Sequence, residues 1–271
     1  MQRFDLSLPT PAENLAFDEA ILEWAEENAA EGEFLRLWES AQPMVVVGRS
    51  SRVGKEVNEE FCRQEDIPIL RRSSGGAAIV TGPGCLMYAV VLSYSVRPEL
   101  KDITRAHSYI LKQLTTSLGP LLTHAGTITC AGTSDLAMQQ GAGSGEQEKT
   151  RSTPRSSPGT LWVAPRSPRK FSGNSLRMKR THLLYHGTLL YAFDLGLIEK
   201  CLRTPPRQPD YRNARSHGDF VMNVPATRQR LADAVIAAFP MASAPTDVPT
   251  SRVEKLVAER FGNDDWNYEL P

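Results

Sequence analysis

The sequence predicts an α+β fold in which a mixed sheet is flanked by helices. Short runs of apolar and β-branched residues, each bounded by Gly, Pro or polar residues, gather early in the chain. Patterns with helical spacing stand before and after these runs. Strands and helices do not alternate strictly, which argues against a doubly wound parallel sheet.

The composition is typical of a soluble globular enzyme. The 271 residues include 31 Lys+Arg and 31 Asp+Glu, and this balance favours neither nucleic acid nor a membrane surface as a partner. The first residues lack the basic flank and apolar core of an export signal. No apolar run reaches the roughly 20 residues of a membrane span. We therefore expect a cytoplasmic protein.

The four cysteines, Cys62, Cys85, Cys130 and Cys201, lie far apart in the chain. None has the CxxC or Cys/His spacing of a zinc site, and their density is too low for a disulfide scaffold. We expect reduced thiols and no metal site.

The first element is a helix over about residues 11–29. Thr10 and Glu13 form a capping box, and Pro11 occupies the first helical position. The apolar face of this helix consists of Leu15, Ile21, Leu22 and Ala25. Five short strands are predicted next, at residues 33–38, 44–47, 67–70, 77–80 and 85–94.

The middle of the chain predicts a helix, a hairpin and an insertion. Asp102 is placed to cap a helix over residues 103–118, which Gly119 and Pro120 would end. Short strands are expected around residues 128–130 and 136–138. At about residues 139–160, Gly, Ser, Pro and charges replace apolar residues, so we expect a disordered, dispensable insertion in a hairpin.

The last part predicts further strands and two helices. After a short LWV strand, HLLYHGTLLYAF predicts a strand pair, or one strand with a turn at Gly187. A helix is expected at residues 226–239. Ser251 and Glu254 form a second capping box for a helix through residue 261, with Gly262 at its C-cap. Residues 1–271 thus form one domain, with a helical C-terminal extension at about residues 226–271.

The strongest chemical signal is the glycine-containing segment between two predicted strands. Paired glycines let the backbone approach a ligand, and nearby guanidinium groups suit an anionic or carbonyl-bearing group. A plain hairpin turn would explain the same pattern. The candidate binding residues here are Arg71, Arg72, Ser73, Ser74, Gly75, Gly76 and Ala77.

Two further segments carry polar residues between apolar ones. One is KFSGNS, which begins at Lys170 and includes Gly173, and the other contains His186 and Gly187. A lysine before a turn is often only solvated, and a histidine in an apolar run is often a satisfied core residue. Both alternatives stay open on pattern alone.

Together, the order of these motifs resembles the catalytic domain of the lipoate–protein ligase and octanoyltransferase family, also called biotin/lipoate A/B protein ligases. Its motifs here are Glu56-Val57-Asn58, RRSSGGAAIV, Asp135-Leu136, KFSGNSLR and YHGTLL. The resemblance extends from about Glu13 to Asn223 and skips the insertion.

The resemblance implies the family's α+β fold, with the glycine-containing loop and Lys170 lining a tunnel for a fatty or lipoyl chain. Lys170 is similar to the family's lysine that contacts the acyl carbonyl or acyl-adenylate, and Asp135, Gly173, His186 and Gly187 would bind substrate. Lipoyl-domain proteins would be the partners, namely the glycine cleavage H protein and the E2 subunits of 2-oxoacid dehydrogenases. The chain departs from the family by having Ala77 in place of a third glycine and Thr81 in place of His or Tyr.

Cys130 suggests a transferase. Its spacing to Asp135-Leu136 resembles the Cys-Pro-Gly-x-x-Asp-Leu segment of cysteine-dependent transferases that move octanoyl groups from the H protein, with Ala131 replacing proline. The resemblance implies an acyl-thioester at Cys130, helped by the charge of Lys170 and needing no cofactor. An inert core thiol is the alternative for Cys130, and the other three cysteines match no nucleophile position.

Two other functions remain open. An ATP-dependent ligase would form an acyl-adenylate with ATP and Mg²⁺. The roughly fifty residues after Asn223 are too few for the accessory domain of complete ligases, so that domain could be a separate polypeptide. A non-catalytic homologue would bind the acyl chain without turnover. Whether the chain is octanoyl or lipoyl depends on the length of the tunnel.

Overall fold

The computed structural model describes residues 1–28, 32–140, 167–205, 208–240 and 249–269. The predicted insertion, from residue 141 on, and the LWV strand lie outside the described residues.

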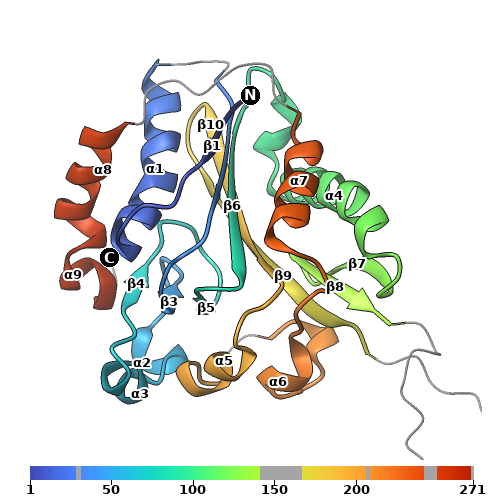
Figure 1. Ribbon diagram of the computed structural model, residues 1–271. Coiled ribbons are helices and arrows are strands. Elements are labelled where there is room, and N and C mark those ends of the chain that lie inside the picture. The colour runs from blue at the N-terminus through green and yellow to red at the C-terminus, as the bar shows by residue number, and fades with distance from the viewer. Residues whose placement is uncertain (29–31, 141–166, 206–207, 241–248, 270–271) are drawn as a thin grey trace, which may run out of the picture.

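A seven-stranded sheet forms the centre of the molecule (Figure 1). Its order is β1 (Gln2–Asp5), β2 (Phe34–Trp38), β6 (Cys85–Ser93), β10 (His182–Leu190), β9 (Arg169–Met178), β8 (Asp135–Gln139) and β7 (Thr127–Ala131). Only the pairing of β1 with β2 is parallel. A smaller mixed sheet has the order β4 (Ile69–Arg71), β3 (Met44–Val47) and β5 (Ile79–Thr81). The α+β class with a mixed sheet is thereby confirmed.

Each face of the large sheet has its own apolar core. Helix α1 (Pro11–Asn28) and the small sheet cover one face, and α4 (Ile103–Leu122) and α7 (Arg228–Ala238) cover the other (Figure 1). The predicted capping box begins α1, since Thr10 N donates to Glu13 Oε2 at 2.9 Å and Glu13 N donates to Thr10 Oγ1 at 3.2 Å.

Short helices surround the small sheet and the lower end of the large one (Figure 1). They are α2 (Val53–Glu56), α3 (Glu59–Gln64), α5 (Leu195–Cys201) and α6 (His217–Phe220), with a 3₁₀ turn at Asp210–Arg212. Another 3₁₀ turn, at Pro98–Lys101, precedes α4 and packs against it. Helix α8 (Thr250–Leu256) packs beside α1, and after a π turn (Val257–Phe261) α9 (Asp264–Tyr268) packs against β4. In the described parts of the chain, no helix has the length and apolar character to cross a membrane.

Three local predictions were wrong. Helix α4 continues through Gly119 and Pro120 to residue 122, because proline in the last turn removes one backbone donor while Leu121 and Leu122 gain burial. Strand β10 runs without a turn through Gly187.

The third concerns α8, which begins at Thr250, one residue before the predicted cap at Ser251. Its N-cap is Pro249, with no side-chain cap bond. Gly262 does occupy the C-cap of the following turn, as predicted.

Candidate active site

Arg72 holds the glycine-containing loop together. Its Nη2 donates to the carbonyls of Gly75 at 2.6 Å and Ala77 at 3.0 Å, and its Nη1 donates to Val46 O at 3.1 Å. Gly76 has φ +92°, a conformation that favours glycine. Burial lowers the pKa of Arg72 to about 10. Among the described residues no carboxylate forms an ion pair with Arg72, although the charge of Glu56 attracts its guanidinium from further away, so an anionic ligand in the cavity could pair with Arg72 directly.

Arg71 points away from this loop. Its guanidinium donates to the backbone carbonyls of Gly48, Arg49, Ser51, Trp266 and Asn267. These donations occupy the side chain, so Arg71 ties α9 to the small sheet and does not line the cavity.

Lys170 and Asp135 form an ion pair across β9 and β8. Lys170 Nζ lies 2.8 Å from Asp135 Oδ1. The other carboxylate oxygen, Oδ2, accepts from the Tyr211 hydroxyl at 2.7 Å. Burial, and then the charge of Asp135, raise the pKa of Tyr211, which keeps this phenol protonated. Gly173 leaves room for the ammonium, because a Cβ there would lie 2.8 Å from Lys170 Nζ and the lysine side chain would have to shift.

Asn174 fixes the adjoining part of β9. Its Nδ2 donates to Ser134 O at 2.6 Å, and its Oδ1 accepts from the Tyr88 hydroxyl. A Cβ on Gly187 would overlap Asn174 Oδ1. The glycine in β10 therefore permits the close packing of this amide, which explains why β10 has no turn there.

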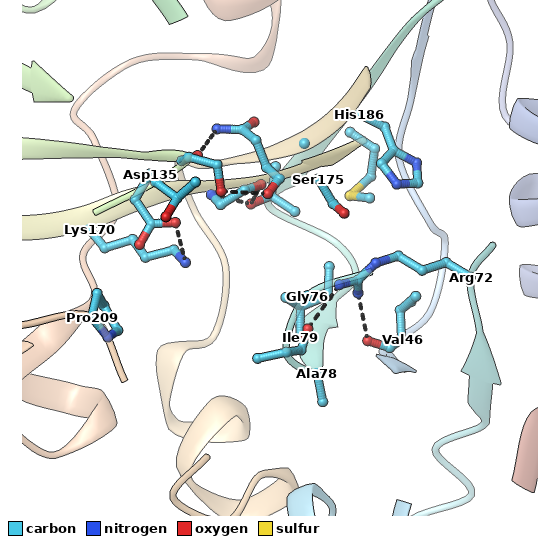
Figure 2. A pocket seen from close by; sticks show the side chains of 18 of the residues that line it. Val46, Arg72, Gly76, Ala78, Ile79, Asp135, Lys170, Ser175, His186 and Pro209 are labelled. Carbon is cyan, nitrogen blue, oxygen red and sulfur yellow. Dashed lines mark hydrogen bonds and ion pairs between the residues drawn. The ribbon is translucent and has the colours of Figure 1, made fainter. Parts of the chain in front are cut away.

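The side chains that lie around one cavity of about 380 Å³ include Arg72, Asp135 and Lys170 (Figure 2). Apolar atoms of Leu15, Val46, Ile79 and Met87 form part of its wall. A second hollow of about 130 Å³ shares several wall residues with it, among them Lys170 and Asp135. Of the predicted site residues, the cavity brings together Arg72, Gly76, Ala77, Asp135, Lys170, Gly173, His186 and Gly187.

The other predicted residues of the loop lie behind the cavity wall. Ser73 and Ser74 are buried, at 4% and 1% exposed, and Gly75 contributes its carbonyl to Arg72 and to Ser175 Oγ. They support the loop and do not line the cavity.

The structure does not bring Cys130 into this cavity. Cys130 pairs with Leu136, whose side chain is buried in the core beneath α4, and residues opposite each other in a ladder share a face. Asp135, the next residue of β8, therefore points to the other face. The thiol of Cys130 is exposed and lies 3.8 Å from Thr115 Oγ1 of α4, in a separate hollow. The predicted proximity to Lys170 assumed one shared face, and strand alternation places the two side chains on opposite faces.

Two site residues were missed from the sequence. Asn174 lies within the KFSGNSLR motif and could have been found by its place between Gly173 and Ser175. Tyr211 follows a polar, proline-containing segment that carries no motif, so no signal in the sequence indicated its contact with Asp135.

Comparison with known proteins identifies relatives along the whole chain. The family described as the lipoyl protein ligase A/B catalytic domain matches residues 10–239. The "Probable lipoate-protein ligase A" of Mycoplasma genitalium is 24% identical over 281 residues, covering 99% of this chain and 72% of that protein. The octanoyltransferase LipM of Brevibacillus brevis is 25% identical over 275 residues, or 95% of each chain.

Among solved structures, the bipartite lipoate protein ligase of Thermoplasma acidophilum shares the fold. It has a TM-score of 0.76 at 20% sequence identity, over 100% of this chain and 96% of that one. The match of the family along residues 10–239 is the finding that settles the assignment, and the chain belongs to the lipoyl protein ligase A/B catalytic domain family.

Proposed function

We propose that the chain attaches an octanoyl or lipoyl group to the lysine of a lipoyl domain. The observation that carries this proposal is the place of Lys170, whose side chain lines two hollows at once. The larger hollow offers apolar wall for an acyl chain, and the smaller one gives a second reactant access to the same ammonium.

The reaction is an acyl transfer. The neutral amine of the carrier lysine attacks the acyl carbonyl carbon, a C–N bond forms, and the bond to the leaving group breaks as the amine loses its proton. Negative charge develops on the carbonyl oxygen, where a fixed cation stabilises the transition state. Lys170 supplies this cation, and Asp135 and Tyr211 hold it in place.

We propose an acyl-adenylate, made from ATP with Mg²⁺ on its phosphates, as the acyl donor. In the described residues, no thiol lines either hollow. Cys62, Cys85 and Cys201 are buried in the core, and Cys130 lies on the opposite face of its hairpin. The guanidinium of Arg72, which forms no ion pair among the described residues, suits a phosphate or carboxylate group in the cavity.

A thioester at Cys130 is the second candidate route. Of the four cysteines it alone is exposed, and Thr133 borders both its hollow and the main cavity. The relative named octanoyltransferase LipM matches along 95% of each chain. On this route an octanoylated carrier donates to Sγ, and ATP is not needed.

The test is the intact mass of an apo E2 lipoyl domain after incubation with the purified chain. One reaction contains octanoate, ATP and Mg²⁺, and the other contains octanoylated H protein without ATP. We expect the acceptor to gain one octanoyl group in the first reaction. A gain only in the second, with acylated Cys130, would establish the thioester route, and no gain in either would contradict the function.

A further inference from the structure

We infer that Asp18 and Ser74 are positioning residues for the Arg72 guanidinium beside the cavity: Asp18 orients His186, His186 orients Ser74, and Ser74 contacts Arg72 directly. The inference rests on the acyl attachment proposed above. Its basis is a row of buried polar side chains behind the cavity wall, which begins at Arg36 of β2 and ends at Arg72.

The row crosses from α1 to the glycine-containing loop. Arg36 Nη1 donates to Asp18 Oδ1 at 2.7 Å. Asp18 Oδ2 faces His186 Nδ1 of β10 at 3.6 Å, an electrostatic contact longer than a hydrogen bond. His186 Nε2 lies 2.6 Å from Ser74 Oγ. Asp18, Ser74 and Arg36 are at most 2% exposed, so these polar groups depend on one another for partners.

The donors and acceptors determine in which direction the hydrogen bonds between Arg72, Ser74 and His186 run. Arg72 Nε donates to Ser74 Oγ at 3.1 Å, and a guanidinium can only donate. The hydroxyl hydrogen of Ser74 is then free to point at His186 Nε2. In this tautomer the proton on His186 is at Nδ1, which faces the carboxylate of Asp18. Asp18 thus selects the tautomer that accepts from Ser74.

The order Ser74, His186, Asp18 resembles that of a nucleophilic triad, but the geometry favours positioning. Ser74 does not line the cavity and its oxygen is occupied by Arg72, whereas His186 and Arg72 do line it. A substrate carbonyl therefore cannot reach Oγ. The row therefore holds the guanidinium of Arg72 in a fixed orientation at the cavity.

A double-mutant cycle on octanoate binding tests the inference. Asp18→Asn and Ser74→Ala each interrupt the row on one side of His186, and we expect each to weaken octanoate affinity about tenfold, measured as Kd by calorimetry and as KM. Because Asp18 reaches Arg72 only through His186 and Ser74, the double variant should also lose about tenfold, where independent effects would give about a hundredfold. The value of kcat should change far less than KM.

A conservative variant of His186, and a variant of Glu33 outside the cavity, test whether the loss of octanoate affinity comes only from a disturbed fold. His186→Gln, whose amide can still accept from Ser74, should retain most of the affinity that His186→Ala loses. Glu33→Gln breaks another carboxylate–arginine pair, between buried Glu33 and half-buried Arg97, and should leave Kd unchanged.

Three results would overturn the inference: additive losses in the cycle, a loss of melting temperature with unchanged Kd, or covalent labelling of Ser74 by a fluorophosphonate. If the wild-type chain binds octanoate but acylates no carrier, the proposed function fails. The cycle on Kd still decides the role of Asp18 and Ser74.

Discussion

Asp135 accepts from two donors that come from distant parts of the chain. Lys170 and Tyr211 each contact one of its oxygens, at 2.8 and 2.7 Å. A carboxylate held at both oxygens cannot rotate freely, so the ammonium of Lys170 stays in one place before substrate arrives. Preorganised charge of this kind is what acyl transfer requires.

Tyr211→Phe tests this arrangement. Loss of the hydroxyl removes one donor from Asp135 and should lower kcat about tenfold, with a change of about 1 kcal/mol in the free energy of unfolding. Steady-state kinetics and urea unfolding check the two numbers. Unchanged kcat would show that Lys170 is positioned without Tyr211.

Cys130→Ala distinguishes the two acyl donors. The thiol faces α4, on the opposite side of the β7–β8 hairpin from Asp135 and Lys170. We therefore expect the ATP-dependent acylation rate of Cys130→Ala to lie within about twofold of wild type, as judged by carrier mass over time. Abolished acylation would establish Cys130 as the nucleophile.

At the scale of elements, the close packing of β6 and β9 around Gly187 determines where strand β10 lies. Gly187 pairs with Tyr88 on one side and Asn174 on the other, and both side chains fill the space above it. The strand thereby brings His186 and Thr188 to the cavity.

Gly187→Ala should be strongly destabilising, by about 1–3 kcal/mol, because the new methyl group overlaps Asn174 Oδ1. Gly119→Ala is the matched control. Gly119 lies in α4, and a Cβ added to it would meet no neighbouring atom of the described residues within 4 Å. Alanine has the higher helix propensity, but Pro120 disfavours helical backbone for a preceding residue with a Cβ, so we expect a change in the free energy of unfolding within about 1 kcal/mol. Urea unfolding measures both, and a neutral Gly187→Ala would show that Asn174 can move.

Sequence patterns predicted no strand at β1 or β9 and misplaced the cap of α8, but they did predict several other strands and caps, because these depend on neighbours in the chain. The capping box at Thr10 and the strands of the large sheet between residues 33 and 94 are examples. Sequence patterns failed where the local structure depends on contacts with residues that are distant in the chain. Leu121 and Leu122 carry α4 past Pro120, and the face on which Cys130 lies depends on its pairing with Leu136.

For the site too, sequence patterns identified motifs but not contacts with residues distant in the chain. The loop and Lys170 were identified through motifs, and the structure places Arg72 and Lys170 around one cavity. Arg71 belongs to the same motif, yet its contacts with Trp266 and Asn267 depend on a helix nearly two hundred residues away. No local pattern could reveal that.

At the scale of the molecule, the two ends of the chain support the site from behind. Helix α1 supplies Asp18 to the buried row, and α9 holds Arg71 at the base of the loop. The cavity therefore lies between elements from the beginning and middle of the chain, and α9 near its end supports the loop from behind through Arg71.

The most direct test of the proposed chemistry is carrier acylation by Lys170→Ala. The ion pair with Asp135 is partly exposed, so its loss should cost about 1 kcal/mol, too little to unfold the domain. Lys55→Ala is the control, since Lys55 is exposed and outside the cavity. Intact mass of the lipoyl domain is followed over time with octanoate, ATP and Mg²⁺. We predict that Lys170→Ala remains folded by circular dichroism and acylates the carrier at least about a hundredfold more slowly, while Lys55→Ala matches wild type. A folded Lys170→Ala variant with a near-normal rate would contradict the central claim that transfer takes place at this ammonium.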